Sequence, residues 1–172
     1  MRAIDWCRTF PGHVRHAIDR ALTRIEVCLA RSSRATPGLF DVAAMAAGRG
    51  LRIAVVTNNS RAAVEEFVAV NPGFAVAGVI EGRRADELDR LKPSPANVLS
   101  AVSALGLASR ECLMIGDSVS DVRAARSAGV PVIGLATSSV RGVDLESAGP
   151  DALVTSMQEV ADALASDREN AT

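Results

Sequence analysis

The chain has 172 residues, 48% of them hydrophobic, and a formal net charge of −1. This length suits one domain with its own core, and the near-neutral charge indicates neither a disordered chain nor a surface for nucleic acid. The start of the chain lacks the apolar run of a signal peptide, and no stretch approaches the roughly 20 apolar residues that span a bilayer. We therefore predict a cytoplasmic protein with neither nucleic-acid nor membrane partners.

Helical and extended patterns alternate along the sequence. In chain order they predict helices over 13–29 and 39–47, a strand over 51–56, a helix over 61–70, a strand over 75–80, a helix over 95–105, a strand over 112–115, a helix ending at 128–129, strands over 132–135 and 152–155, and a helix over 157–164. Strands that alternate with helices indicate parallel crossovers. The predicted fold is a doubly wound α/β sheet, which binds ligands beyond the carboxyl ends of its strands.

Some of these elements carry specific signals. Ser60 and Ser94 stand where side chains cap helices, and Pro95 suits a first helical position. In the helix over 95–105, four apolar residues are expected to face inward: Val98, Leu99, Val102 and Leu105. The strand over 51–56 is an almost unbroken apolar run, which predicts burial on both faces.

Polar residues follow two of the predicted strands. Thr57, Asn58 and Asn59 end the first strand, and Asp117 and Asp121 stand four residues apart where the third strand leads into a helix. Lys92, the only lysine among 19 basic residues, precedes the helix that begins near Pro95. An ammonium group is a compact charge on a flexible stem, so it can touch a carboxylate and a phosphate together.

Each of these groups also has a plain structural explanation. Thr57 can be a helix cap, Asp117 and Asp121 a cap and a surface acid, and a lone lysine can reflect codon bias. Together, however, they supply hydroxyl and amide donors, one ammonium group and the paired carboxylates that suit Mg²⁺. This set of groups is typical of phosphoryl transfer.

Three segments resemble motifs II, III and IV of the haloacid dehalogenase superfamily, in order. They are Val55-Val56-Thr57-Asn58, Leu91-Lys92-Pro93, and Met114-Ile115-Gly116-Asp117-Ser118 with Asp121. The resemblance covers roughly residues 36–164. It implies that Thr57 and Lys92 are catalytic, that Asn58 and Asn59 join them in binding substrate, and that Asp117 and Asp121 hold Mg²⁺.

The superfamily's first motif, a nucleophilic aspartate in the pattern DxDxT or DxDxV, has no counterpart in the sequence. Its nearest imitation is Asp5-Trp6-Cys7-Arg8-Thr9, where Cys7 replaces the second acid. We therefore interpret residues 1–35 as the remnant of a helical cap, 36–165 as the α/β core without its central first strand, and 166–172 as a disordered tail. Without that strand, two rows of backbone groups are expected to lack partners.

The leading hypothesis is a Mg²⁺-dependent hydrolase of small phosphorylated metabolites, with the nucleophilic aspartate absent from the chain as given. Paired carboxylates favour a phosphatase over a dehalogenase, because a metal helps phosphate transfer and not halide displacement. The alternative is a non-catalytic remnant that binds phosphate or a partner. A receiver domain is less favoured, because it would need early acidic residues and a lysine after the aspartate strand, whereas Lys92 precedes that strand. A dinucleotide-binding domain is less favoured still, because no GxGxxG motif follows a predicted strand.

Overall fold

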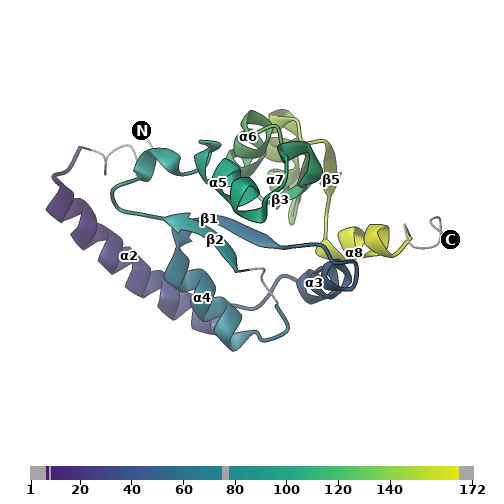
Figure 1. Ribbon diagram of the computed structural model, residues 1–172, viewed down its shortest axis with the longest axis horizontal. Coiled ribbons are helices and arrows are strands. Elements are labelled where there is room, and N and C mark those ends of the chain that lie inside the picture. Colours follow the sequence, from purple (N-terminus) through teal and green to yellow (C-terminus); the bar gives the residue numbers. More distant parts are fainter. Residues whose placement is uncertain (1–6, 8, 75–77, 167–172) are drawn as a thin grey trace.

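The computed structural model describes residues 7, 9–74 and 78–166 (Figure 1). Its helices and strands are α2 (Gly12–Ser32), α3 (Leu39–Gly48), β1 (Ala54–Ser60), α4 (Arg61–Val70), β2 (Val79–Arg83), the 3₁₀ helix η1 (Leu88–Arg90), α5 (Ala96–Leu105), the 3₁₀ helix η2 (Ser109–Glu111), β3 (Met114–Gly116), α6 (Val119–Ser127), β4 (Val132–Leu135), α7 (Ser139–Ala148), β5 (Ala152–Val154) and α8 (Met157–Ser166). Helices alternate with strands as the sequence predicted. The α/β class is therefore confirmed.

The strands are parallel, and they form two sheets. β1 pairs with β2 in one sheet, and β3, β4 and β5 form the other in that order. In the part of the chain that the structure describes, no hydrogen-bonded ladder joins β1 to β3. The break therefore falls between β1, which contains Thr57, and β3, which leads to Asp117.

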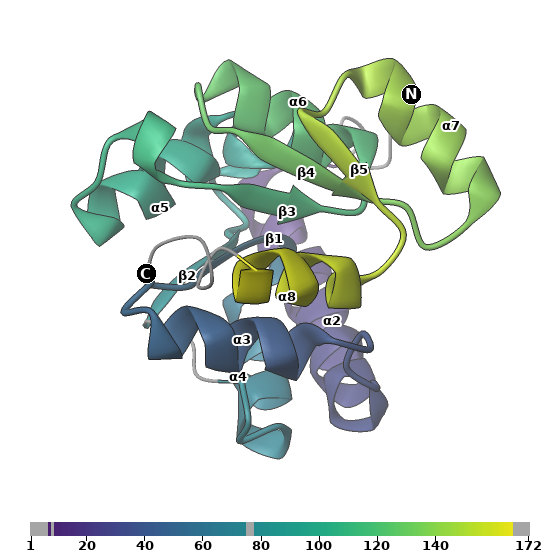
Figure 2. The same ribbon diagram turned by 90° about the vertical axis from the view of Figure 1, so that its right-hand side faces the viewer.

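Helices cover both sheets. α2 packs along α4, and α5 packs against β1 and β2. α6 and α7 contact the second sheet, while α3 and α8 lie side by side near the C-terminal end of the described chain (Figure 2). The assignment of residues 1–35 to a cap stays a prediction. None of the described helices is long and apolar enough to cross a membrane.

The main apolar core lies on the second sheet and its helices and extends to α5, and Val56 of β1 packs against it. It is made of small and branched side chains, as close packing of helices on a short parallel sheet requires. Its buried members are Val98, Val102, Val122, Ala124, Ala125, Ala128, Val130, Val132 and Leu145. Leu145, only 1% exposed, places α7 in this core.

Several sequence predictions were wrong in detail. Leu99 faces out and is 43% exposed, because Ala101 takes the inward position on α5 instead. β1 is half-buried rather than buried on both faces, and it runs on through Ser60. Residues 75–77 of the second predicted strand lie outside the described residues, and β2 itself spans Val79–Arg83.

The C-terminal half also differs from the prediction. The sequence predicted no helix between β4 and β5, whereas α7 fills that stretch. The solvent-facing Val140 and Val143 of α7 are exposed, which obscures its helical period. Ser166, assigned to the tail, ends α8. Residues 167–172, as well as Asp5 of the imitation motif, lie outside the described residues.

Candidate active site

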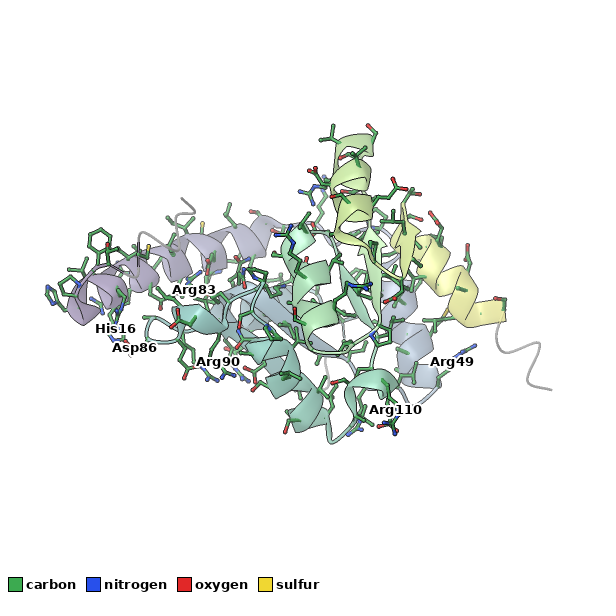
Figure 3. All side chains as sticks on the ribbon, turned by 90° about the horizontal axis from the view of Figure 1, so that it is seen from above. His16, Arg49, Arg83, Asp86, Arg90 and Arg110 are labelled. Atoms are coloured by element: carbon green, nitrogen blue, oxygen red, sulfur yellow. The ribbon has the colours of Figure 1, made fainter. Side chains whose placement is uncertain are left out.

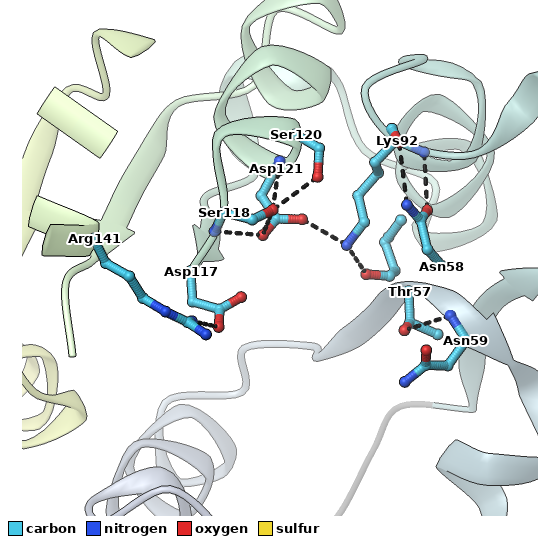
Figure 4. A network of polar contacts seen from close by, with 10 residues as sticks. Thr57, Asn58, Asn59, Lys92, Asp117, Ser118, Ser120, Asp121 and Arg141 are labelled. Atoms are coloured by element: carbon cyan, nitrogen blue, oxygen red, sulfur yellow. Dashed lines mark hydrogen bonds and ion pairs between the residues drawn. The ribbon is translucent and has the colours of Figure 1, made fainter. Parts of the chain in front are cut away.

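The polar ends of the two sheets meet around Lys92 (Figure 4). The Lys92 ammonium donates to the backbone oxygen of Val56 in β1 at 2.7 Å and forms an ion pair with Asp121 Oδ1 at 2.7 Å. The Lys92 side chain is 11% exposed and that of Asp121 is 7% exposed. One largely shielded cation thus joins the first sheet to the helix that follows β3, across the break between the sheets.

Asp121 owes its position to the first turn of α6. Ser118 caps this helix, and the carboxylate of Asp121 accepts from the Ser118 backbone N–H at 3.0 Å and from its hydroxyl at 2.7 Å. The close approach of Asp121 to the end of β3 requires glycine at position 116, because a Cβ there would overlap the Asp121 side chain. Both oxygens of Asp121 therefore have protein partners.

Asp117 has a different environment, although it lies only four residues away. Its side chain is 55% exposed, and its carboxylate accepts from the guanidinium of Arg141 in α7 at 2.5 Å. Arg141 is itself 52% exposed. An ion pair between two solvent-exposed side chains contributes little free energy, so Arg141 can release Asp117 readily.

Residues 57–59 at the end of β1 have three different roles. The Thr57 hydroxyl oxygen accepts the Asn59 backbone N–H at 3.1 Å, which leaves the hydroxyl proton free to donate. Asn58 uses its side-chain amide on Lys92, accepting from the Lys92 N–H at 2.9 Å and donating to the Lys92 carbonyl at 3.1 Å. Asn59 is exposed. The structure thus brings Thr57, Asn58 and Lys92 together and engages Asn58 with protein.

A partly buried charge cluster behind β1 was not predicted from the sequence. Arg83 of β2, 8% exposed, forms ion pairs with Asp19 at 2.7 Å and Glu26 at 2.5 Å, both on α2 (Figure 3 labels Arg83). Arg83 also donates to the Asn58 carbonyl at 3.2 Å, and Glu26 accepts the Ser60 N–H at 2.8 Å. The one signal in the sequence is the spacing of Asp19 and Glu26, which puts two acids on one face of a helix.

Burial alone would raise the pKa of Glu26, but the hydrogen bonds from Arg83 and Ser60 lower it further than burial raises it, so it lies below the ordinary value of 4.5. Burial alone would lower the pKa of Arg83, and the hydrogen bonds to Glu26 and Asp19 raise it instead. Both groups are therefore charged at neutral pH.

A family model described as haloacid dehalogenase-like hydrolase matches residues 2–129. The chain belongs to this family. It is 34% identical over 138 residues to the phosphoglycolate phosphatase of Nitrosococcus oceani, covering 78% of this chain and 59% of that protein. It is 33% identical over 113 residues to the protein CbbY of Rhodobacter capsulatus, covering 65% and 50%.

A solved structure of this haloacid dehalogenase-like hydrolase family supports the same conclusion. The crystal structure of CbbY from Rhodobacter sphaeroides in complex with phosphate superposes with a TM-score of 0.72 and 29% identity, covering 84% of this chain and 65% of that one. The chain thus spans about half the length of the curated relatives it matches. The predicted family and its Rossmann-like fold are both confirmed.

Proposed function

We propose that this chain binds a small phosphorylated metabolite at the Lys92 site, as part of a Mg²⁺-dependent phosphomonoester hydrolase. The observation that carries the proposal is the position of the Lys92 ammonium, between the polar end of β1 and the first turn of α6. The hydroxyl hydrogen of Thr57 and the backbone N–H groups at the N-terminus of α6 add donors for an anion. Relatives named as phosphoglycolate phosphatases, and a related structure solved with phosphate, support this class of ligand.

Asp117 is the residue that we assign to Mg²⁺. The described residues contain no group of three or more His, Cys, Asp or Glu side chains arranged for a metal. This fits Mg²⁺, which is often held by one or two carboxylates together with substrate phosphate and water. When bound, Mg²⁺ would supply charge that stabilises the transferring phosphoryl group. Asp121, the second predicted ligand, is better placed to hold Lys92 than to coordinate a metal.

The chain's own residues can bind and orient the phosphoryl group. Lys92 would neutralise charge on phosphate oxygens, and Thr57 would donate its hydroxyl proton to one of them. Among the described residues, Asp121 is the carboxylate paired with Lys92, and its oxygens are already engaged with Lys92 and Ser118. Because this carboxylate is engaged and not available to attack phosphorus, the arrangement favours a second candidate function, in which the chain binds phosphate without hydrolysing it.

The proposal is tested by measuring phosphate binding and phosphatase turnover with the same protein. Binding of inorganic phosphate, with and without Mg²⁺, is followed by calorimetry, and turnover is followed with an aryl phosphate. Because Lys92 supplies charge at the phosphate, Lys92→Met should weaken phosphate binding and reduce any turnover about a hundredfold. Asp117→Asn should remove the dependence of both on Mg²⁺.

The matched control is Asp144→Asn, which removes an exposed carboxylate from α7 and should change neither activity. Binding without turnover selects the non-catalytic candidate. If Lys92→Met and Asp117→Asn bind phosphate as the unmodified protein does, the site is assigned wrongly.

A further inference from the structure

Both the side chain and the main chain of Lys92 are fixed by protein contacts. Its ammonium contacts the Val56 oxygen and Asp121, while its backbone N–H and C=O are both bonded to the side chain of Asn58. One amide side chain therefore satisfies both polar groups of the Lys92 main chain (Figure 4). A lysine stem is long and flexible, so an ammonium keeps a fixed position only if its backbone is fixed as well.

Asn58 is in turn fixed from the opposite side. Its backbone carbonyl accepts from Arg83, which is buried against Glu26 and Asp19 of α2. Glu26 also accepts the N–H of Ser60, two residues after Asn58. Hydrogen bonds and ion pairs thus run without a break from α2, through β2 and the end of β1, to the main chain of Lys92.

From this geometry we propose that Asn58 is a positioning residue, which sets where the Lys92 ammonium lies and does not itself bind phosphate. The sequence led us to expect Asn58 among the substrate ligands. Its amide oxygen accepts from the Lys92 N–H, and one of its two amide N–H groups donates to the Lys92 carbonyl, so both atoms of the amide are bonded to the Lys92 backbone. The inference rests on the proposed function only in naming Lys92 as the phosphate-binding cation.

The single lysine of the chain makes a direct test possible without any turnover. Protein labelled with ¹⁵N-lysine gives one backbone amide signal, that of Lys92. Asn58→Ala removes the acceptor of this amide, so its signal should shift and its hydrogen exchange should quicken about tenfold, as expected for the loss of one hydrogen bond. Asn59→Ala, the matched control next to it, should leave both unchanged, because no hydrogen bond joins the described Asn59 side chain to Lys92.

A second measurement reads the position of the ammonium group. Acylation of Lys92 is followed by peptide mass spectrometry, which separates this side chain from the N-terminal amine. Lys92 is shielded at 11% exposure, so its acylation should be slow in the unmodified protein and several-fold faster in Asn58→Ala. A merely structural role for Asn58 would lower the melting temperature without this change in the reactivity of the folded protein.

Asn58→Asp keeps the size of the side chain and an acceptor for the Lys92 N–H, and loses the donor to the Lys92 carbonyl. It should keep the slow amide exchange that Asn58→Ala loses, and it serves as the folded variant if Asn58→Ala does not fold. The proposal is overturned if the Lys92 amide signal and the acylation rate in folded Asn58→Ala match those of Asn59→Ala. Failure of phosphate to bind, with these signals changed as expected, would instead overturn only the proposed function.

Discussion

The two sheets of this protein are stabilised by different kinds of interaction. The sheet of β3, β4 and β5 rests on an apolar cluster in which Val122, Val132 and Leu145 are almost fully buried. In the sheet of β1 and β2, all residues of β2 and the residues of β1 from Ala54 to Asn58 are half-buried. Behind this sheet lies the charge cluster of Arg83, Glu26 and Asp19. The first of these sheets, the apolar half, is therefore stabilised mainly by close packing, whereas the second, the charged half, although Val56 of β1 packs against the same apolar cluster, also relies on paired charges.

This difference matters for the site, because Lys92 lies where the halves meet. Its ammonium bonds to β1 in the charged half and to Asp121 at the start of α6 in the apolar half. Apolar packing fixes α6 through Val122 and Ala125, while charge pairing fixes the end of β1 through Asn58. A change in either half should therefore alter the position of the Lys92 ammonium.

The strongest test of the charged half is Arg83→Met. Removing one partner leaves Glu26 and Asp19 without their shared cation beside β1. Loss of one partner of a fully buried ion pair costs about 3–5 kcal/mol, and solvent around the partly exposed acids should reduce this to about 2–3 kcal/mol. Urea unfolding should show this loss in the free energy of unfolding. The control is Arg61→Met, whose exposed ion pair with Glu65 has the same 2.7 Å length as the one between Arg83 and Asp19.

Arg61→Met should cost less than about 1 kcal/mol, since exposed ion pairs contribute little. Equal costs for the two variants would show that burial does not distinguish these pairs, and the comparison between the halves would fail.

The matching test of the apolar half is Leu145→Ala. This change leaves a cavity beside α6 and should lower the free energy of unfolding by about 2–4 kcal/mol, because leucine at this site is 1% exposed. Leu99→Ala, at a position 43% exposed, should cost less than about 1 kcal/mol. The loss in Leu145→Ala should be the same at pH 4 and pH 7, and a strong pH dependence would contradict an apolar origin.

The sequence predicts the apolar half of the fold better than the charged half. Buried Val122 and Ala125 of α6 belong to a stretch predicted as a helix, and residues 57, 92 and 117 lie in segments that resemble three family motifs in order, so the fold class could be inferred. Leu99 misled the prediction because its spacing also fits a helical period. α7 was missed because Val140 and Val143 are apolar residues that face solvent.

The charge cluster could not be predicted because its members are far apart in the chain. Arg83 is 57 residues from Glu26 and 25 from Asn58, and nothing local sets it apart from the neighbouring Arg84, which is exposed. The same holds for the pairing of Asn58 with Lys92 across 34 residues. Residue type and spacing indicated which side chains gather at the site, and only the folded chain shows which of them bind one another.

The smallest expected effect is the loss, at low pH, of the stability that the Glu26 carboxylate contributes. The pKa of Glu26 in the folded chain lies below 4.5, its ordinary value, because hydrogen bonds from Arg83 and Ser60 outweigh burial. A carboxyl group with a lowered folded-state pKa contributes stability above pH 4.5, and this contribution is lost as the pH falls through the folded-state value. Glu26→Gln should therefore be less stable than the unmodified protein at pH 7, and the difference should narrow below pH 4.5. Urea unfolding of both proteins at a series of pH values measures this difference, and a gap that stays constant from pH 7 to pH 3 would mean that the charge of Glu26 does not stabilise the β1 half.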